Sequence, residues 1–558
     1  MKQILLLCAV LAASMGNAQK NKTLSKDYEY KISEPYRVVD ADDKYYISEE
    51  GKAIAVKIDK RDIYIQKFDT DKPAQVSMKL YEDAFPKNAV YERIAYIKGR
   101  VQLFFTQWDG DNKIEQLFTQ EIDLDKGEFV GGKKLILQVQ GKVSGQASGR
   151  VMDFNLTDKF PIYVSYDHSN FLVKFRRIPE KKRDTKSFDK IGLIAFDGDM
   201  NKLSERELTM PYTERQMDNL DYYVDGIGNV YMLNRIFHDD TTDEKKKKDD
   251  TTPNYHLELF TLKPGSDSFQ VTKVDAKDAF INDLAFFGNG KGDVVVAGFY
   301  NNGMNRTGFF SKGSRDGYNY YKNCDGIITY KMKPDGTLYD MFTHEIPLEL
   351  LNQNESKKTK RKNEKKEEKG EGAKFYDLHL RDLEVKPDGS IVLAAEQYFS
   401  VLHTTSGGMN GGMNTYYTYH YNDMLVAKIL PNGSLGWMKK IPKQQFGMQG
   451  RGSMGFNYFS NDKECFLVFF DNPDNVDITD DKVPATYSDR KKGYLTVVRI
   501  SDADGSSTRG SILNAKEVED FKLHQISADR MMKVTDNLLL MEAYKKNKED
   551  VLIKIVLK

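Results

Sequence analysis

The chain has 558 residues, and its 83 Lys and Arg side chains are balanced by 83 Asp and Glu side chains, so the formal net charge is zero. Because charges of both signs are interspersed, the composition argues against nucleic acid as a partner. Three cysteines are too few for a disulfide scaffold, so a chain of this length must be stabilised by burying apolar area.

Residues 1–18 have the pattern of a secretory signal peptide. A basic residue precedes the apolar run 4–15, and small residues follow where signal peptidase cleaves. This run is too short to span a membrane, and no later stretch is long and apolar enough. The sequence therefore predicts an exported mature chain, 19–558, located in the periplasm, at the outer membrane or outside the cell. The remaining Cys324 and Cys465 belong to different repeats, which favours two buried thiols over a bridge.

A hairpin unit recurs along the chain. Segment 423–443, DMLVAKILPNGSLGWMKKIPK, has two runs of alternating apolar residues separated by Pro431-Asn432-Gly433. This pattern predicts a β-hairpin, because Asn-Gly supplies the positive φ of a tight turn. Similar units begin at Ile63, Leu117, Ile191, His256, Asp325 and Tyr494. Such repeats in an all-β chain indicate a β-propeller.

In chain order, a strand-like segment at 26–36 has no neighbouring hairpin partner. Seven sets of four short strands follow it, and a final group supplies only three. The sets span 43–80, 93–139, 150–210, 220–274, 281–344, 378–441 and 455–516, and the last three strands lie within 529–557. The strands expected in the third set are 150–156, 161–167, 192–197 and 205–210.

A last blade of three strands would leave an unpaired edge, which closed propellers avoid. We therefore predict that segment 26–36 supplies the missing strand and ties the two ends of the chain together. The predicted fold is an all-β propeller of eight four-stranded blades, with seven blades plus an extra hairpin as the alternative. A pair of β-sandwiches is disfavoured, because the same order of four strands repeats throughout.

Two segments, VKPDGSIVLAAE at 385–396 and ILPNGSLGW at 429–437, resemble the repeats of secreted bacterial β-propellers, and the leader ending in NAQ resembles those of Bacteroidetes. The resemblance covers most of the mature chain through short turn motifs. It implies the fold and no particular activity.

Long insertions are expected on one face of the propeller. Loops between second and third strands open on the same face as the connections between blades, and the long segments concentrate there, at 238–254, 301–323, 352–372, 400–422 and 472–493. Loops of this length are candidates for function. The Lys- and Glu-rich parts of 238–254 and 352–372 lack apolar residues, so we expect flexible spacers, with a charged site for a partner as the alternative.

Tyrosine is concentrated within 316–322 and 415–422. Its flat ring and single hydroxyl suit the recognition of sugars or peptides. The alternative is that these segments are long hairpin arms that pack on each other.

Aligning the repeats places a polar or aromatic side chain near the end of each second strand, around the mouth of the elaborated face. The candidate binding residues of this rim and of the tyrosine-rich loops are Trp108, Asp167, His168, Arg235, Tyr300, Tyr318, Tyr320, Tyr321, Glu396, Tyr398, Tyr416, Tyr417, Tyr419, Tyr421 and Asp471. The scattered His residues and the acidic run 471–481 lack the spacing of a zinc or calcium site, and no nucleophile elbow or phosphate loop is present. Neither a metal nor a cofactor is expected.

The favoured hypothesis is an exported, non-catalytic propeller that binds a protein or glycan partner through its elaborated face, as part of a cell-envelope assembly. The alternative is a hydrolase acting on glycans or peptides in the central funnel, where a glycosidase would need two carboxylates at a set separation. Convergence of rim carboxylates in the funnel would favour the enzyme. A third hypothesis is a stable repeat protein whose loops only keep it soluble. The oligomeric state is not predicted.

Overall fold

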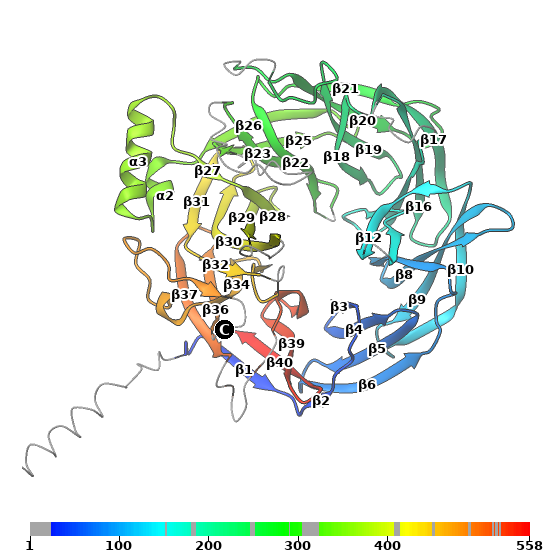
Figure 1. Ribbon diagram of the computed structural model, residues 1–558, viewed down its shortest axis with the longest axis horizontal. Helices are drawn as coiled ribbons and strands as arrows, with labels where there is room; N and C mark the ends of the chain where they lie inside the picture. The colour runs from blue at the N-terminus through cyan, green and yellow to red at the C-terminus, as the bar shows by residue number, and fades with distance from the viewer. Residues whose placement is uncertain are drawn as a thin grey trace, which may run out of the picture.

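The computed structural model describes residues 24–558 except 151–152, 180–185, 246–250, 290, 304–322, 407–412, 449–451, 489–492, 516–517, 519–522 and 524–525. Eight antiparallel β-sheets are arranged in a ring around one axis, and the strands of each sheet follow one another outward from that axis (Figure 1). The prediction of an all-β, eight-bladed propeller is confirmed.

The first four blades use strands that follow one another along the chain. Blade one comprises β3 (Asp43–Glu49), β4 (Lys52–Asp59), β5 (Asp62–Asp69) and β6 (Ala74–Tyr81); blade two comprises β7 (Ala89–Ile97), β8 (Arg100–Asp109), β9 (Ile114–Asp123) and β10 (Glu128–Gln140); blade three comprises β14 (Ile162–Val164), β15 (Asn170–Arg177), β16 (Phe188–Asp197) and β17 (Lys202–Thr213); blade four comprises β18 (Met217–Val224), β19 (Val230–Phe237), β20 (Tyr255–Leu262) and β21 (Gln270–Val274).

The other four blades carry the longest insertions and the closure. Blade five comprises β22 (Phe280–Gly288), β23 (Val294–Asn301), β25 (Gly326–Met332) and β26 (Leu338–Glu345); blade six comprises β28 (Leu378–Val385), β29 (Ile391–Ser406), β30 (Met413–Ile429) and β31 (Leu435–Ile441); blade seven comprises β33 (Asn457–Ser460), β34 (Glu464–Asp471), β36 (Tyr494–Ser501) and β37 (Ser507–Asn514); blade eight comprises β38 (Met531–Thr535), β39 (Leu538–Lys546), β40 (Glu549–Leu557) and β1 (Tyr28–Ile32).

Shorter strands and helices lie outside the four-stranded blades. They are β2 (Tyr36–Arg37) on β40, β11 (Val143–Ser144) on β15, the hairpin β12 (Gln146–Arg150) with β13 (Asp153–Thr157), the pair β24 (Asn323–Cys324) with β27 (Phe375–Tyr376), β32 (Gln445–Gly447) on β30, β35 (Tyr487–Ser488) on β32, the 3₁₀ helices η1 (Pro473–Asn475) and η2 (Ala528–Arg530), and the helices α2 (Leu348–Asn352) and α3 (Lys357–Glu368).

The N-terminal strand closes the ring as predicted. β1 runs antiparallel to the last strand, with Tyr28 opposite Leu557 and Ile32 opposite Ile553. β2 continues the pairing, since Tyr36 lies opposite Asp550. The edge that a three-stranded blade would leave open is therefore covered by the other end of the chain.

The apolar core is divided among the blade interfaces. Alternate residues of each inner strand face the blade before and the blade after, so each of the eight interfaces contains one apolar cluster. Cys324 and Cys465 are buried free thiols in two of these clusters. The cluster between blades eight and one is among the smallest, and buried charges accompany it.

Blade three differs from the prediction in its first two strands. Segment 153–157, expected within the first strand, instead pairs with β12 outside the blades. The expected second strand supplies β14 as the first strand, and the true second strand is β15. The prediction was wrong because β14 is only three residues long, whereas segment 150–156 alternates as a strand does.

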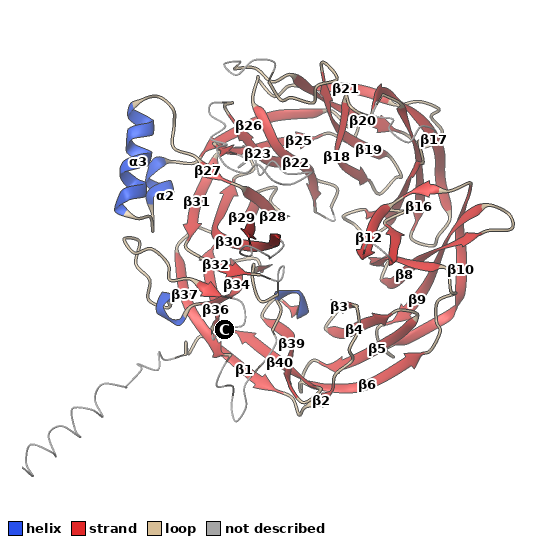
Figure 2. Ribbon diagram, in the orientation of Figure 1, coloured by secondary structure: helices blue, strands red, loops and turns tan. Residues whose placement is uncertain are grey.

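The charged segment 352–372 also differs from the prediction. Instead of a flexible spacer, it forms α3, which begins after Ser356, whose side chain accepts a hydrogen bond from the Thr359 amide. α2 and α3 lie together at the outer edge of the ring (Figure 2). Neither helix of the described chain is long and apolar enough to cross a membrane. The predicted signal peptide lies outside the described residues.

Candidate functional site

The first strand bulges at the same place in several blades, toward the elaborated face. The register shifts between Tyr91 and Arg93, between Ile281 and Asp283, and between Leu380 and Asp382. A bulge adds a residue and redirects its side chain. The redirected residues are Glu92, Asn282 and Arg381, and each contacts a side chain on the second strand: Thr106 Oγ1 donates to Glu92 (2.9 Å), Asn301 donates to Asn282 (2.6 Å) and Arg381 Nε donates to Glu396 (3.0 Å).

The Arg381 bulge borders a polar pocket of about 420 Å³ where blades six, seven and eight approach the axis. Its lining comes mainly from the first strands of these blades, together with one residue each from the middle of β29 and of β30. The lining residues are Leu380, Arg381, Asp382, Glu396, Tyr421, Phe456, Asn457, Tyr458, Phe459 and Met531. We call this the funnel pocket.

Glu396 is neutralised by two cations at the base of the funnel pocket. Its side chain is 2% exposed, and its oxygens lie 3.0 Å from Arg381 Nε and 2.7 Å from Lys443 Nζ. Lys443 is fully buried and also donates to the Tyr421 carbonyl (3.0 Å). Burial lowers the pKa of Lys443, although the Glu396 carboxylate opposes that shift. Both oxygens of Glu396 are therefore bound by cations.

Asp382 and Asp471 are two further carboxylates near this site. Burial raises the pKa of Asp382 to about 6, against the stabilising effect of the Leu383 amide. Burial likewise raises the pKa of Asp471, while Arg509 and Asn475 oppose it. Asp471 is 2% exposed, so it lies in the wall between blades six and seven instead of in the funnel.

A tyrosine-bearing hairpin extends from blade six beside the funnel pocket. β29 and β30 pair as far as Ser406 and Met413, and β32 braces β30 through residues 419–421. Within this arm the rings of His403 and Tyr416 stack 4.9 Å apart. Tyr416 and Tyr417 are 40% and 44% exposed. The insertion is therefore a paired hairpin arm that presents two tyrosine rings to solvent.

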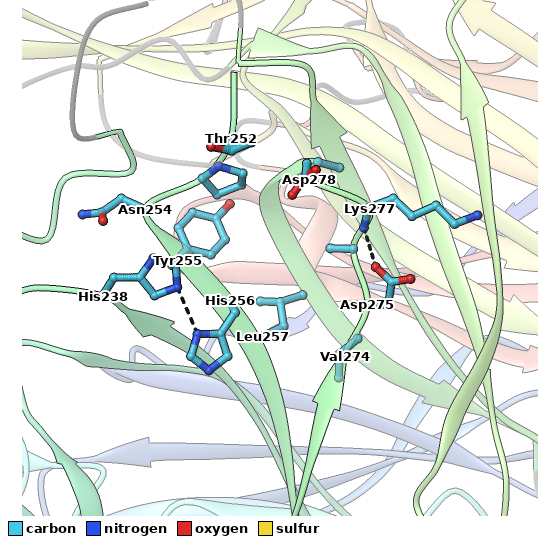
Figure 3. A pocket seen from close by; sticks show the side chains of 13 residues that line it. His238, Thr252, Asn254, Tyr255, His256, Leu257, Val274, Asp275, Lys277 and Asp278 are labelled. Carbon is cyan, nitrogen blue, oxygen red and sulfur yellow. Dashed lines mark hydrogen bonds between the residues drawn. The ribbon is translucent and has the colours of Figure 1, made fainter. Parts of the chain in front are cut away.

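A second pocket, of about 510 Å³, lies at the elaborated face of blade four (Figure 3). His238 and Tyr255 lie on one side of it, and Asp275 and Lys277 on the other. His238 Nε2 lies 3.2 Å from His256 Nδ1, and His256 Nε2 lies 3.0 Å from Glu258. These contacts form a row of side chains from the pocket to the buried Glu258.

The structure places the predicted rim residues on several blades and brings only some of them together. Trp108, Arg235, Tyr300 and Asp471 lie near the ends of second strands, as the repeat alignment requires, whereas Glu396 lies inside β29, which continues into the arm. Glu396, Tyr398 and Tyr421 are brought together, since the Tyr398 and Tyr421 rings are 4.7 Å apart. Trp108, Arg235 and Tyr300 belong to other blades; Arg235 is buried and donates to the Ile281 carbonyl (2.6 Å).

Asp167 and His168 do not lie at the end of a second strand, so this part of the prediction is wrong. They form the turn from β14 to β15, which opens on the plain face. Asp167 accepts hydrogen bonds from Ser165 (2.6 Å) and from the Ser169 amide (3.1 Å), the pattern of a local turn. Tyr318, Tyr320 and Tyr321 lie outside the described residues.

Arg381, Asp382 and Lys443 were not predicted as site residues. Alternation cannot locate a bulge, so it could not place Arg381. A sequence clue existed for the aspartate: Asp221, Asp283 and Asp382 recur in three first strands. Each lies at the bulge, and Asp221 and Asp283 accept the Phe286 (2.8 Å) and Phe299 (3.1 Å) amides. Among the described residues, no three His, Cys, Asp or Glu side chains are grouped to hold a metal ion.

No protein-family model and no curated protein matches the chain. Several solved structures are similar in fold at low identity. A prolyl endopeptidase is 10% identical with a TM-score of 0.35, over 93% of this chain and 55% of its own, so this chain spans about half the length of that enzyme. A polysaccharide lyase is 8% identical with a TM-score of 0.35, over 97% of this chain and 95% of its own. The β-propeller domain of the trilobed protease from Pyrococcus furiosus is 11% identical with a TM-score of 0.30, over 84% and 97%. Similarity at this level carries no argument about function.

Proposed function

We propose that this chain is an exported, non-catalytic propeller that binds a protein or glycan partner of the cell envelope through its elaborated face. The binding surface is the funnel pocket together with the exposed tyrosines of the blade-six arm. Tyrosine rings beside ion-paired polar groups suit a ligand with flat apolar patches and many hydroxyl or amide groups.

The observation that carries the proposal is the pairing of the rim carboxylates. Glu396 is held by Arg381 and Lys443, and Asp471 is buried beside Arg509 (3.6 Å). Both oxygens of Glu396 are occupied by these two cations, and Asp471 lies in the wall between the blades, so neither side chain is free to reach a substrate, whereas a glycosidase needs one carboxyl group as an acid. These groups support a preorganised binding wall.

The test is affinity purification of partners from envelope extract with the wild-type chain and with a Tyr416→Ala/Tyr417→Ala variant. Both side chains are exposed, so their removal should not alter folding. We expect roughly tenfold weaker capture of a stoichiometric partner. Tyr339→Ala is the matched control, since Tyr339 is 38% exposed on a different blade. Equal capture by all three proteins would contradict the proposal for the arm.

A hydrolase acting on glycans or peptides is the second candidate function, and Asp382 favours it. Its pKa of about 6 leaves it partly protonated near neutral pH, and it lines the funnel pocket. The test is a panel of glycans and peptides with the wild-type chain and the Asp382→Asn variant. Turnover that the substitution abolishes would support the enzyme; no turnover by the wild type would count against it.

A further inference from the structure

Helix α3 carries an uninterrupted cationic face. Its sequence, KKTKRKNEKKEE, contains no apolar side chain, and the residues turned toward the body are Thr359, Lys360, Asn363 and Lys366. On the exposed side lie Lys358, Arg361, Lys362, Lys365 and the C-cap residue Lys369. At about 100° per residue, these five fall within an arc of roughly 100° that contains no carboxylate. We call them the basic stripe.

Among the described residues, no Asp or Glu oxygen lies within ion-pair distance of the five cations of the basic stripe. The carboxylates of α3 are Glu364, Glu367 and Glu368, which lie outside the arc. Glu367 accepts a hydrogen bond from the Ala373 amide (2.5 Å), at the return of the chain to the ring. A row of uncompensated cations attracts an anionic partner.

The helix is held in place, which distinguishes it from a solvated spacer. Lys440, 2% exposed, donates to the Gln353 carbonyl (2.9 Å) and forms an ion pair with Glu355 (3.1 Å). Asn354 donates to the Thr479 and Lys482 carbonyls (2.9 Å each), which ties the segment to blade seven. Lys366 donates to Tyr376 Oη (2.6 Å). Buried polar contacts therefore fix a helix that buries no side chain of its own.

The position and the one-sided charge of α3 indicate the shape of its partner. α3 lies on the outer edge of the ring, outside blades five and six (Figure 1). Glu364 and Glu368 lie beyond one edge of the stripe and Glu367 lies on the opposite side of the helix, so a partner that surrounds the helix, such as a nucleic-acid groove, would bring its phosphates against these carboxylates. A flat anionic surface would meet the stripe alone.

We propose that the basic stripe docks the protein, edge-on, to the negatively charged headgroups of a membrane. Because α3 has no apolar residue, the contact is electrostatic and does not enter the hydrocarbon. Edge-on docking leaves the elaborated face and the funnel pocket open to the side. The inference goes beyond the proposed binding function and does not depend on the identity of that partner.

The test is sedimentation with lipid vesicles, using protein purified from cells that express the full chain so that any leader is processed. We expect binding to phosphatidylcholine vesicles that contain about 30% phosphatidylglycerol, and not to phosphatidylcholine alone. Lys358→Glu/Arg361→Glu/Lys362→Glu/Lys365→Glu should weaken binding at least roughly 600-fold, since each of the four cations beside anionic headgroups contributes roughly fivefold. Raising the salt concentration to about 0.5 M should also release the wild type, because screening then acts within a few ångströms.

The matched control changes the same amount of charge elsewhere. Lys72→Glu/Lys87→Glu/Lys263→Glu/Lys463→Glu alters four exposed lysines on other blades and should bind as the wild type does. Thermal unfolding of both variants should match the wild type, since no substituted side chain is buried. Equal losses in both variants, no wild-type binding to the anionic vesicles, or stripe-dependent binding to duplex DNA without vesicle binding would each overturn the proposal.

Discussion

Buried charges at the closing interface connect three segments that are distant in sequence. Lys57 and Glu542 are fully buried, and Lys57 Nζ lies 2.8 Å from both Glu542 oxygens. Tyr46 Oη (2.6 Å) and Tyr36 Oη (3.0 Å) also donate to Glu542. Asp550 lies 3.7 Å from Lys57 and has no hydrogen-bond partner for its oxygens in the described chain. Both oxygens of Glu542 thus accept hydrogen bonds, whereas the oxygens of Asp550 accept none from the described residues.

This asymmetry predicts opposite effects for two isosteric substitutions. Burial raises the pKa of Glu542, but Lys57 and its hydrogen bonds outweigh burial and lower it overall. Burial, then the charge of Glu542, raises the pKa of Asp550 to about 6. We expect Glu542→Gln to destabilise the protein by about 3–5 kcal/mol, because it leaves Lys57 buried with a poorly placed partner. Asp550→Asn should be neutral or stabilising at neutral pH.

The pH dependence separates the two carboxylates. The folded protein binds a proton at Asp550 more tightly than the unfolded chain does, so the wild type should gain stability relative to Asp550→Asn as the pH falls from about 7 to about 4. The stabilisation by Glu542 is present above its unfolded pKa and is lost below it. Denaturant unfolding between about pH 7 and pH 4 measures the effect of Asp550, and the loss of the Glu542 contribution appears below about pH 4, as the pH falls through the lowered pKa of that group. A constant difference between wild type and Asp550→Asn would contradict the assignment of the raised pKa.

At the scale of the elements, two glycines in the turns of blade six show how backbone conformation and packing between blades contribute to the hairpin units. Gly389 and Gly433 occupy equivalent turns of blade six and have nearly the same φ, 83° and 85°. A Cβ at Gly433 would lie 2.1 Å from the Phe342 ring of blade five, whereas at Gly389 it would lie 3.9 Å from its nearest neighbour, Pro431. The two positions therefore share backbone strain and differ in packing.

We expect Gly389→Ala to cost about 1–2 kcal/mol, the usual cost of a left-handed conformation for alanine. Gly433→Ala should cost about 1–3 kcal/mol more, because Phe342 must move. Denaturant unfolding of the two variants gives the comparison directly. Equal costs would show that the ring of Phe342 can move aside freely and that this contact between blades five and six contributes little.

The same elements show what the sequence could and could not predict. Alternating runs and turn residues located the hairpins, because a side-chain period of two and a positive φ leave a direct trace in sequence. β14 is too short for alternation to identify it. The bulge at Arg381 interrupts the alternation that would have shown to which side the Arg381 side chain points. α3 was mistaken for a spacer since its stability comes from tertiary contacts at Lys440 and Asn354. The ion pairs of Glu396 depend on Lys443, which meets it only after folding.

At the scale of the whole molecule, the fold depends on β1 completing blade eight. Its side chains alternate between the core and solvent: Tyr28, Tyr30 and Ile32 are buried or partly buried against blades seven and eight, while Glu29 and Lys31 are exposed. Contacts of β1 join residues about one full chain length apart, so they form only when the ring closes. Opening the ring would expose the β40 edge and its buried Ile553 and Ile555.

We therefore expect Tyr28→Ser/Tyr30→Ser/Ile32→Ser to destabilise the protein by about 3 kcal/mol or more, since it removes apolar side chains that hold β1 on the core. The variant should also aggregate through the uncovered edge on heating. Glu29→Ser/Lys31→Ser changes the same strand on its solvent side and should cost less than about 1 kcal/mol, because the ion pair of Glu29 with Lys558 is exposed. Denaturant unfolding and light scattering measure both effects. If the variant with core-facing substitutions and the variant with solvent-facing substitutions unfolded alike, the other seven interfaces would be enough to hold the ring. The pairing of β1 with β40 would then contribute little to stability.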